Sequence, residues 1–428
     1  MNIEEAMRYI HKTEWQGSRP GLSRISALLA MLGNPQDSLS AIHIAGTNGK
    51  GSTSAMLASV LRAEGYRTAL YTSPYLYRFG ERIQVDGEPI PDDALCRVTE
   101  RLRPLCDSME DSPTEFELIT AAAFLYFAER EVDYAVIEVG MGGRLDATNV
   151  LSHPLLSVVT GIALDHTAYL GDTVSAIARE KAGIFRSGTP AVAGMLLPEA
   201  AAVLAEEAAR IGTTLTFAEE EALSDIVATP YGTSFSYRER REVRLPFAAL
   251  YQPRNAALVL DACDALRKRG VRLSEESVRR GLATVSWPGR FEYFSHEPDV
   301  VFDGSHNPEG IAAAEASIRH LYGGRILLLT GVMRDKDYAS MLDCLAGCTA
   351  RVFAVRPDNP RALPAAELAE AWRERGIPAT PYSDVGEAMK EALREAREEG
   401  LPLFILGSLY LYREAKDAFD AAKEELGL

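Results

Sequence analysis

The sequence has few cysteines, and their arrangement argues against a scaffold held together by disulfides or by a structural zinc ion. Only five of the 428 residues are cysteine, and no two of them form a Cys-x-x-Cys pair. Disulfide frameworks normally use an even number of cysteines, and zinc sites use closely spaced pairs. Free thiols of this kind are typical of proteins from a reducing compartment.

The sequence also lacks a long apolar run and a basic leader. No stretch approaches the roughly 20 apolar residues that a helix needs to cross a bilayer. The first five residues, MNIEE, include two acids where a secretory signal would have basic side chains. We therefore expect a cytoplasmic protein that has no membrane partner.

Basic residues are fewer than acidic residues. There are 45 Lys and Arg against 61 Asp and Glu, which gives a formal net charge of −16. Such a charge excludes a general affinity for nucleic acid, although a local basic site can still bind an anionic substrate. The chain is otherwise of ordinary globular composition, and its length exceeds what one hydrophobic core usually organises.

Strand-like and helix-like segments alternate along the chain, which predicts an α/β fold with a mainly parallel sheet covered by helices. A break at Pro288 and Gly289 divides it into a larger domain, residues 1–290, and a smaller one, residues 291–428. Residues 233–245 alternate imperfectly, and we expect an exposed hairpin attached to the main sheet. The expected strands are residues 41–45, 134–139, 156–162, 191–195, 299–302 and 326–330. The expected helices are residues 53–64, 118–130, 174–182, 255–268 and 311–321.

A glycine-rich loop, Gly46–Ser52, follows the first expected strand and precedes a helix. Glycines allow backbone N–H groups to converge on phosphates, while the helix N-terminus and a lysine add positive charge. The loop departs from the general pattern G-x-x-x-x-G-K-[ST], because Ile44 stands where glycine is expected and Gly51 follows Lys50. A turn without a ligand is the alternative, but the order of elements favours a nucleotide phosphate site.

Polar side chains follow other apolar strands. Glu138 ends one strand, and Asp165 with His166 follows another, where sites form in open α/β sheets. An acid at such a position suits Mg²⁺, which prefers a few protein oxygens together with phosphate and water. A solvated acid and a structural histidine are the alternatives.

Two further positions are ambiguous when the residues are taken alone. Lys181 lies late in an expected helix and reads as an exposed lysine near the helix C-terminus. The turn Asp303–Pro308 follows a strand of the second domain, and Pro308 suits a helix start. This turn can contact a ligand or merely cap a helix.

Together these segments resemble the folylpolyglutamate synthase/dihydrofolate synthase family, a branch of the Mur ligase superfamily. The matching stretches run in the family's order over essentially the whole chain, and Glu138–Asn149 is the most specific of them. They are His43–Ser52, Thr72–Pro74, Glu81–Ile83, Glu138–Asn149, Asp165–Thr167, Glu180–Ile184, Pro288–Arg290, Asp303–Pro308 and Gly407–Tyr410.

The resemblance implies a P-loop-containing, mainly parallel sheet domain followed by a smaller Rossmann-like domain. It implies an ATP-dependent amide ligase that adds L-glutamate to dihydropteroate, to (tetrahydro)folate, or to both. The reaction would pass through an acyl phosphate and give dihydrofolate and folylpolyglutamates, ADP and phosphate. One or two Mg²⁺ ions and a monomeric chain are also expected.

The resemblance assigns roles to individual residues. The residues for ATP are Gly46, Thr47, Asn48, Gly49, Lys50, Gly51, Ser52, Asn255, Arg290 and Asp303. Those for magnesium are Ser73, Glu138, His166 and Lys181, the last as a carbamate. Those for the pterin are Thr114, Glu115, Phe116, Glu117, Leu145, Asp146 and Ala147, with Asp146 as the foremost polar contact. The catalytic residues are Lys50, Lys181 and His306.

The chain departs from the family pattern at three places. Tyr75 stands where histidine is frequent, and Ser305 replaces a usual alanine. Ala249–Gln252 precedes Asn255 where a Gly-x-His-Gln-like segment is common. The last departure leaves the contacts to adenine open.

Two alternatives remain beside the folate ligase. One is another Mur-type ligase that joins a different amino acid to a different acid. The other belongs to a different class, a P-loop ATPase switch or kinase, which leaves Lys181 and Asp303–Pro308 unexplained.

Overall fold

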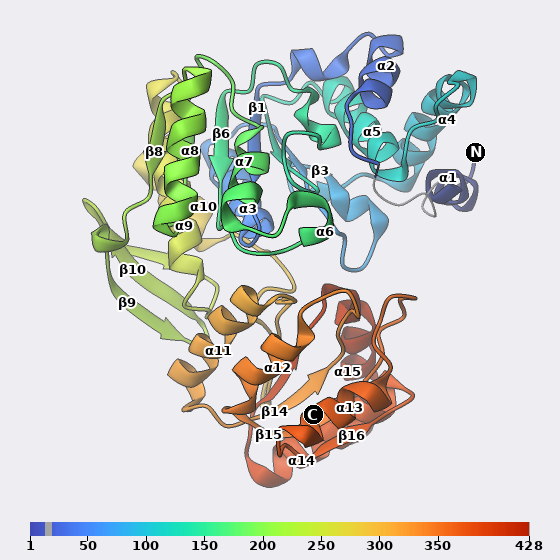
Figure 1. The fold of residues 1–428 in the computed structure, drawn as a ribbon, viewed down its shortest axis with the longest axis vertical. Helices are drawn as coiled ribbons and strands as arrows, with labels where there is room; N and C mark the ends of the chain where they lie inside the picture. The colour runs from blue at the N-terminus through green and yellow to red at the C-terminus, as the bar shows by residue number, and fades with distance from the viewer. Residues whose placement is uncertain (13–18, 428) are drawn as a thin grey trace. The chain divides into compact units, whose positions relative to one another are not determined.

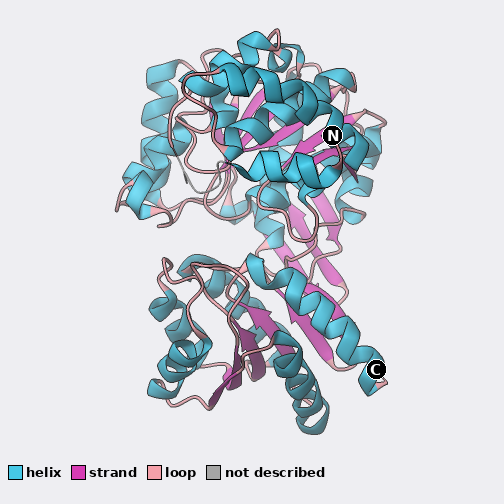
Figure 2. Ribbon diagram, turned by 90° about the vertical axis from the view of Figure 1, so that its right-hand side faces the viewer, coloured by secondary structure: helices cyan, strands magenta, loops and turns pink. Residues whose placement is uncertain are grey.

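Figure 1 shows the computed structural model, which describes residues 1–12 and 19–427. The chain forms two compact units. The first comprises Met1–Leu223 and Arg254–Val285, and the second comprises Ser224–Pro253 and Ser286–Leu428. Each unit has its own sheet and its own apolar core, and Figure 2 shows helices packed around the strands within each unit.

The first unit contains an eight-stranded sheet in the order β4-β3-β2-β5-β1-β6-β7-β8. β1 lies at its centre and pairs in parallel with β5 and β6. Only the β2–β3 and β3–β4 pairs are antiparallel. The strands are β1 (Ala41–Ala45), β2 (Thr68–Tyr71), β3 (Ile83–Val85), β4 (Glu88–Pro89), β5 (Tyr134–Glu138), β6 (Leu156–Val159), β7 (Ala191–Ala193) and β8 (Leu215–Phe217).

Helices cover this sheet with their apolar sides. One core cluster joins α1, α2, α4 and α5 to β1, β2 and β5, and another joins α7 and α8 to β6 and β7. The helices are α1 (Ile3–Ile10), α2 (Ser23–Met31), α3 (Lys50–Glu64), α4 (Asp92–Ser108), α5 (Glu115–Glu129), α6 (Thr167–Leu170), α7 (Val174–Ala182), α8 (Pro198–Ile211), α9 (Gln252–Lys268) and α10 (Glu275–Ala283).

The second unit contains a six-stranded sheet in the order β12-β13-β17-β14-β15-β16. All its pairs are parallel except β12–β13. The strands are β12 (Glu292–His296), β13 (Asp299–Phe302), β14 (Ile326–Thr330), β15 (Thr349–Ala354), β16 (Ala379–Pro381) and β17 (Leu403–Leu406). The helices are α11 (Pro308–Tyr322), α12 (Tyr338–Ala346), α13 (Ala365–Glu374), α14 (Val385–Glu399) and α15 (Tyr412–Leu426). The predicted fold class, two α/β units with mainly parallel sheets, is confirmed.

The expected hairpin is present, but the prediction that it is attached to the main sheet was wrong. β10 (Gly232–Tyr237) and β11 (Arg240–Leu245) pair with β9 (Leu223–Thr229) in a separate three-stranded sheet. β9 escaped the prediction because most of its side chains are exposed, so it lacks the apolar alternation of a half-buried strand.

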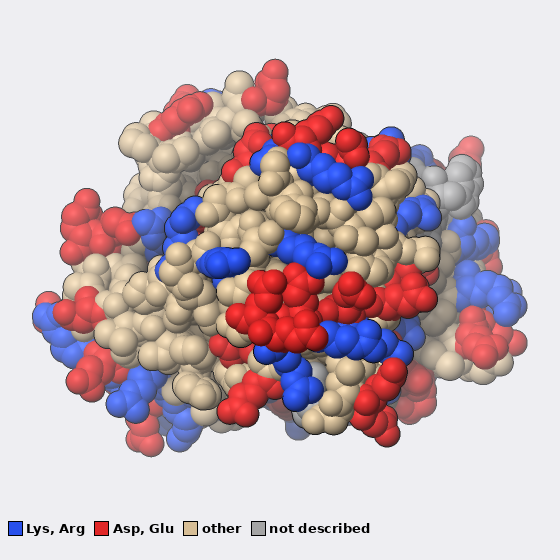
Figure 3. All heavy atoms as spheres, turned by 90° about the horizontal axis from the view of Figure 1, so that it is seen from below, with Lys and Arg blue, Asp and Glu red and all other residues tan. Residues whose placement is uncertain are grey.

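Charge is unevenly distributed on the surface. Figure 3 shows acidic side chains gathered near the centre of one face, with basic side chains scattered around them. Among the described residues, no helix combines the length and the apolar character needed to cross a membrane.

Candidate functional site

The glycine loop connects the central strand β1 to α3. Gly49, with φ +86°, precedes the first residue of the helix, Lys50. A Cβ atom on Gly49 would lie 2.5 Å from Asn255 Oδ1, and one on Gly46 would collide with Thr160 Oγ1. Glycine is therefore required at both positions by close approach, and α3 directs its N-terminus at the loop as a phosphate site needs.

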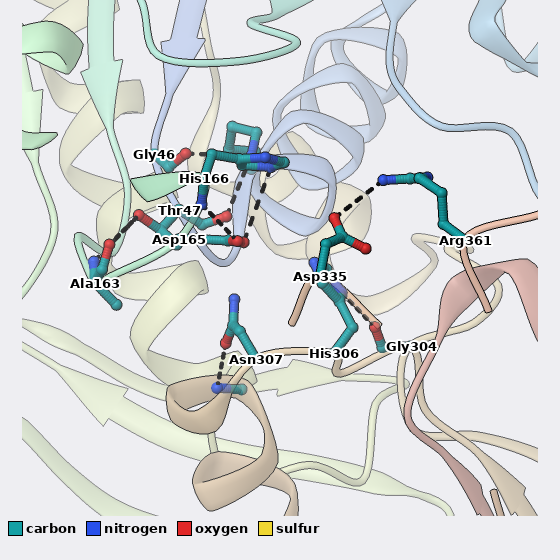
Figure 4. Close-up of polar contacts among 12 residues, drawn as sticks. Gly46, Thr47, Ala163, Asp165, His166, Gly304, His306, Asn307, Asp335 and Arg361 are labelled. Carbon is teal, nitrogen blue, oxygen red and sulfur yellow. Dashed lines mark hydrogen bonds and ion pairs between the residues drawn. The ribbon is translucent and has the colours of Figure 1, made fainter. Parts of the chain in front are cut away.

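The segment after β6 holds this loop in place. Thr160 Oγ1 donates to the carbonyl of Asn48 at 2.7 Å, and the Thr47 N–H donates to the carbonyl of Gly161 at 2.6 Å. Thr47 Oγ1 also donates to the Ala163 carbonyl at 3.1 Å (Figure 4). The loop is thus ordered by the strand beside it. No sequence pattern indicates this role of Thr160, because its partner Asn48 is 112 residues away.

The Lys50 ammonium lies over the loop. Its Nζ donates to the carbonyls of Gly46 and Thr47, each at 3.2 Å. The positive charge of Lys50 therefore lies where phosphate oxygens would accept hydrogen bonds from the backbone N–H groups of the loop.

Replacing Gly49 with alanine should weaken ADP binding at least tenfold, roughly the effect of misplacing one or two phosphate contacts. The added methyl group would displace Asn255 and twist the loop. Gly33→Ala is the matched control, because Gly33 has φ +82° and no atom within 4 Å of the added carbon. Calorimetric titration should show unchanged affinity in the control, and equal losses in both variants would contradict the prediction.

Glu138 and Ser73 meet at the carboxyl end of β5. The Glu138 side chain is 3% exposed, and its Oε2 accepts a hydrogen bond from the Ser73 N–H at 3.3 Å. β1 pairs Ile44 with Glu138, so this carboxylate lies at the sheet edge from which the glycine loop emerges. The structure therefore brings two of the predicted magnesium ligands together.

His166 follows β6 at the same edge. It adopts a left-handed conformation with φ +50°, its side chain is 46% exposed, and its N–H donates to Asp165 Oδ1 at 2.8 Å (Figure 4). Among residues 1–12 and 19–427 there is no group of three or more His, Cys, Asp and Glu side chains able to hold a metal. A hydroxyl, a carboxylate and an imidazole fit Mg²⁺ as a partial shell, because this ion usually keeps water and phosphate ligands.

Lys181 is buried, with 2% of its surface exposed. Burial, aided by the positive charge of Lys50, lowers the pKa of the Lys181 amine to about 7, and Asp165 and Asp146 act in the opposite direction. The prediction of an exposed lysine, which was made from this segment alone, is therefore wrong. A large fraction of this amine is neutral near pH 7.

The loop after β5 buries Lys181 by packing on the end of α7. The Arg144 N–H donates to the Glu180 carbonyl at 2.9 Å. Asn149 Nδ2 donates to the carbonyls of Arg144 and Gly183 at 2.9 and 3.1 Å. Residues 138–149 and 180–184, two of the segments that carry the family resemblance, thus pack against each other.

Asp146 organises that loop. Its Oδ2 accepts the Met141 N–H at 2.9 Å, and its Oδ1 accepts the N–H and hydroxyl of Thr148 at 3.0 and 2.5 Å. Its side chain is 7% exposed, and burial raises the pKa of its carboxyl. Thr148 Oγ1 also contacts Nε2 of buried His43 at 2.8 Å. Contact of Asp146 with a pterin remains a prediction, as do those of Ala147, which is buried, and Leu145, which is 38% exposed.

The other predicted pterin segment starts α5. Thr114 caps the helix, and Glu117 Oε2 accepts the Thr114 N–H at 2.7 Å and Arg24 Nε at 3.0 Å. The Phe116 ring lies against Gly140, so close that a Cβ there would collide with it. Thr114 and Glu117 therefore fix the start of α5 against the glycines that follow Glu138. Glu115 pairs with His11 at 3.3 Å.

In the second unit, Asp303 directly follows β13 and is fully buried. Its Oδ1 accepts the N–H and hydroxyl of Ser305 at 2.9 and 2.5 Å. Its Oδ2 accepts the Phe291 N–H at 2.9 Å and the Tyr251 hydroxyl at 2.5 Å. The bond from the Phe291 N–H thereby also connects the backbone of the preceding residue, Arg290, to the Asp303 carboxylate.

The turn after Asp303 positions His306. Its Nδ1 donates to the Gly304 carbonyl at 2.9 Å, which sets the tautomer of the ring (Figure 4). Asn307 caps α11 by accepting the Gly310 N–H at 2.8 Å. The second unit therefore gathers Arg290, Asp303 and His306 around one turn.

Comparison with known proteins gives consistent results. Residues 44–263 match the Mur ligase middle domain, and residues 289–409 match the Mur ligase glutamate ligase domain. The chain is 38% identical to the folylpolyglutamate synthase of Lacticaseibacillus casei, covering 96% of this chain and 97% of that one. It is 36% identical to the dihydrofolate synthase/folylpolyglutamate synthase of Bacillus subtilis, covering 96% and 98%. The structure of Escherichia coli FolC in complex with DHPP and ADP superposes with a TM-score of 0.86 at 32% identity, covering 99% of each chain.

Proposed function

Because this chain belongs to the folylpolyglutamate synthase/dihydrofolate synthase family of Mur ligases, we propose that it joins L-glutamate to both dihydropteroate and reduced folates. It is an ATP-dependent carbon–nitrogen ligase. The observation that carries the proposal is the meeting of the phosphate loop, Glu138 and buried Lys181 at one sheet edge.

The first step activates a carboxylate, which is a poor electrophile towards an amine. A carboxylate oxygen of the acceptor attacks the γ-phosphorus of ATP, the bond to the β-phosphate oxygen breaks, and ADP leaves. The loop N–H groups and Lys50 bind the phosphates and offset their charge, so catalysis here is mainly positioning and electrostatics. Asn255, beside Gly49, and Arg290, Asp303 and His306 of the second unit are the other proposed nucleotide residues.

Ser73, Glu138 and His166 would hold a magnesium ion. Mg²⁺, when bound, offsets charge on the transferring phosphoryl group. We propose that the neutral Lys181 amine adds to CO₂ and loses a proton, which replaces the buried amine with a carbamate anion. The carbamate would supply oxygen ligands for a second ion.

The second step forms the amide. The glutamate amine attacks the acyl carbon, and the tetrahedral intermediate collapses with loss of phosphate. The packed loop 138–149 includes Leu145–Ala147, and its Gly140 lies against Phe116 of the other segment proposed for the pterin. Exclusion of water matters at this stage, because water would hydrolyse the acyl phosphate.

Purified protein with ATP, Mg²⁺ and L-glutamate should release phosphate only when dihydropteroate or a reduced folate is added. The two pterins are assayed separately, which tests bifunctionality. Release that is unaffected by either acceptor would contradict the folate assignment and favour a different Mur-type ligase. A P-loop kinase would instead leave the phosphoryl group on its partner.

A further inference from the structure

Asp303 links three separate segments of the second unit. Tyr251 lies just before α9, Phe291 lies just before β12, and Ser305 lies in the turn before α11. Within the described part of the chain, the carboxylate accepts four hydrogen bonds, all from these three residues and two to each oxygen. A buried carboxylate is costly unless it is fully hydrogen-bonded, so each donor contributes to holding the segments together.

Two of these donors are hydroxyl groups of residues far apart in the sequence, Tyr251 and Ser305. Each hydroxyl bonds to the same carboxylate at 2.5 Å. Residues that look unrelated in the sequence therefore form one hydrogen-bonded cluster.

The Tyr251 hydroxyl is a dependable donor in this cluster. Burial, together with the negative charge of Asp303, raises the pKa of Tyr251 well above its usual value. The phenol is therefore protonated near neutral pH. Its ring packs with the apolar core of the second unit, which fixes the direction of the hydroxyl.

The cluster also controls residues proposed for the nucleotide. The Gly304 N–H donates to the Gly289 carbonyl at 2.9 Å, which joins the turn to the segment of Arg290. His306 in turn bonds to the Gly304 carbonyl. A shift of the Asp303 carboxylate would thus move both Arg290 and His306.

We propose that Tyr251 is a positioning residue for nucleotide binding, because its hydroxyl fixes Asp303 and through it Arg290 and His306. The inference rests on the proposed function only in taking those residues to contact the nucleotide. Tyr251 itself need not touch the ligand.

Tyr251→Phe removes one hydroxyl and keeps the ring. We expect it to weaken ADP binding in the presence of Mg²⁺ by about tenfold, because the Asp303 carboxylate would hold Arg290 and His306 less firmly after losing a hydrogen bond. KM for ATP should rise by a similar factor, while kcat changes much less. Tyr293→Phe is the matched control in the same unit, because the Tyr293 hydroxyl contacts the Tyr322 hydroxyl at 2.7 Å, whereas the Asp303 carboxylate accepts from Tyr251, Phe291 and Ser305.

Calorimetric titrations well below each variant's thermal midpoint separate binding from stability. Unchanged ADP affinity in a folded Tyr251→Phe protein would overturn the proposal, even if its midpoint fell. An equal loss of affinity in Tyr293→Phe would overturn it too. ADP binding without acceptor-dependent phosphate release would contradict the folate assignment alone, and absence of ADP binding by the unsubstituted protein would overturn both.

Discussion

Lys181→Ala is expected to lower acceptor-dependent phosphate release by at least about 100-fold while the protein still binds ADP. Loss of one preorganised charged group at a reacting centre commonly costs this much. Lys181 is 2% exposed in this protein, so water or an ion from the solvent does not readily take the place of its side chain. Initial rates and ADP titrations on the same preparation measure the two quantities.

Lys268→Ala provides the control, because Lys268 is an exposed lysine at the end of α9. It should retain normal rates. Near-normal turnover of Lys181→Ala would refute the role of the carbamate. Labelled bicarbonate should also give a carbamate carbon signal in the unsubstituted protein that Lys181→Ala lacks.

Formation of the proposed carbamate should depend on pH, and the direction of that dependence follows from the pKa of Lys181. Burial lowers the pKa of Lys181 to about 7, and only the neutral amine attacks CO₂. Below this pKa the amine is protonated, so activity in limiting bicarbonate should fall as the pH drops through about 7. Added bicarbonate should restore part of the loss near neutral pH, and a profile that is indifferent to bicarbonate would contradict the mechanism.

Glu138→Gln should reduce the rate by about 100-fold or more and raise the Mg²⁺ concentration needed for half-maximal activity. The substitution keeps the shape and removes the charge that a hard cation prefers. Glu207→Gln tests whether a lost buried carboxylate matters in general, because Glu207 is 5% exposed and pairs with Arg179 and Arg210 in the same unit. An unaltered magnesium requirement in Glu138→Gln would exclude this carboxylate as a ligand.

Local pattern was sufficient to predict much of the fold. The expected strands 41–45, 299–302 and 326–330 and the helix 174–182 agree with β1, β13, β14 and α7. Apolar runs bounded by turn residues gave these elements directly. α3 begins three residues earlier than expected, at Lys50, because Gly49 in a left-handed conformation starts the helix inside the glycine loop.

The candidate site was less predictable, because its geometry depends on distant contacts. Lys181 has no sequence signal for burial, which arises when the loop around Arg144 packs on the end of α7. The bond from Tyr251 to Asp303 spans 52 residues. Neither helical nor strand periodicity reports such pairs, and the resemblance supplied residue roles without their supporting partners.

The supports of the phosphate loop also bear on synthesis of the chain. Gly46–Ser52 leaves the ribosome early, yet Thr160 closes one side of this loop and Asn255 the other. A nascent chain that ends before Thr160 has neither support, and one that ends before Asn255 has only the first. The complete surroundings of this loop therefore exist only after more than half of the protein has been translated.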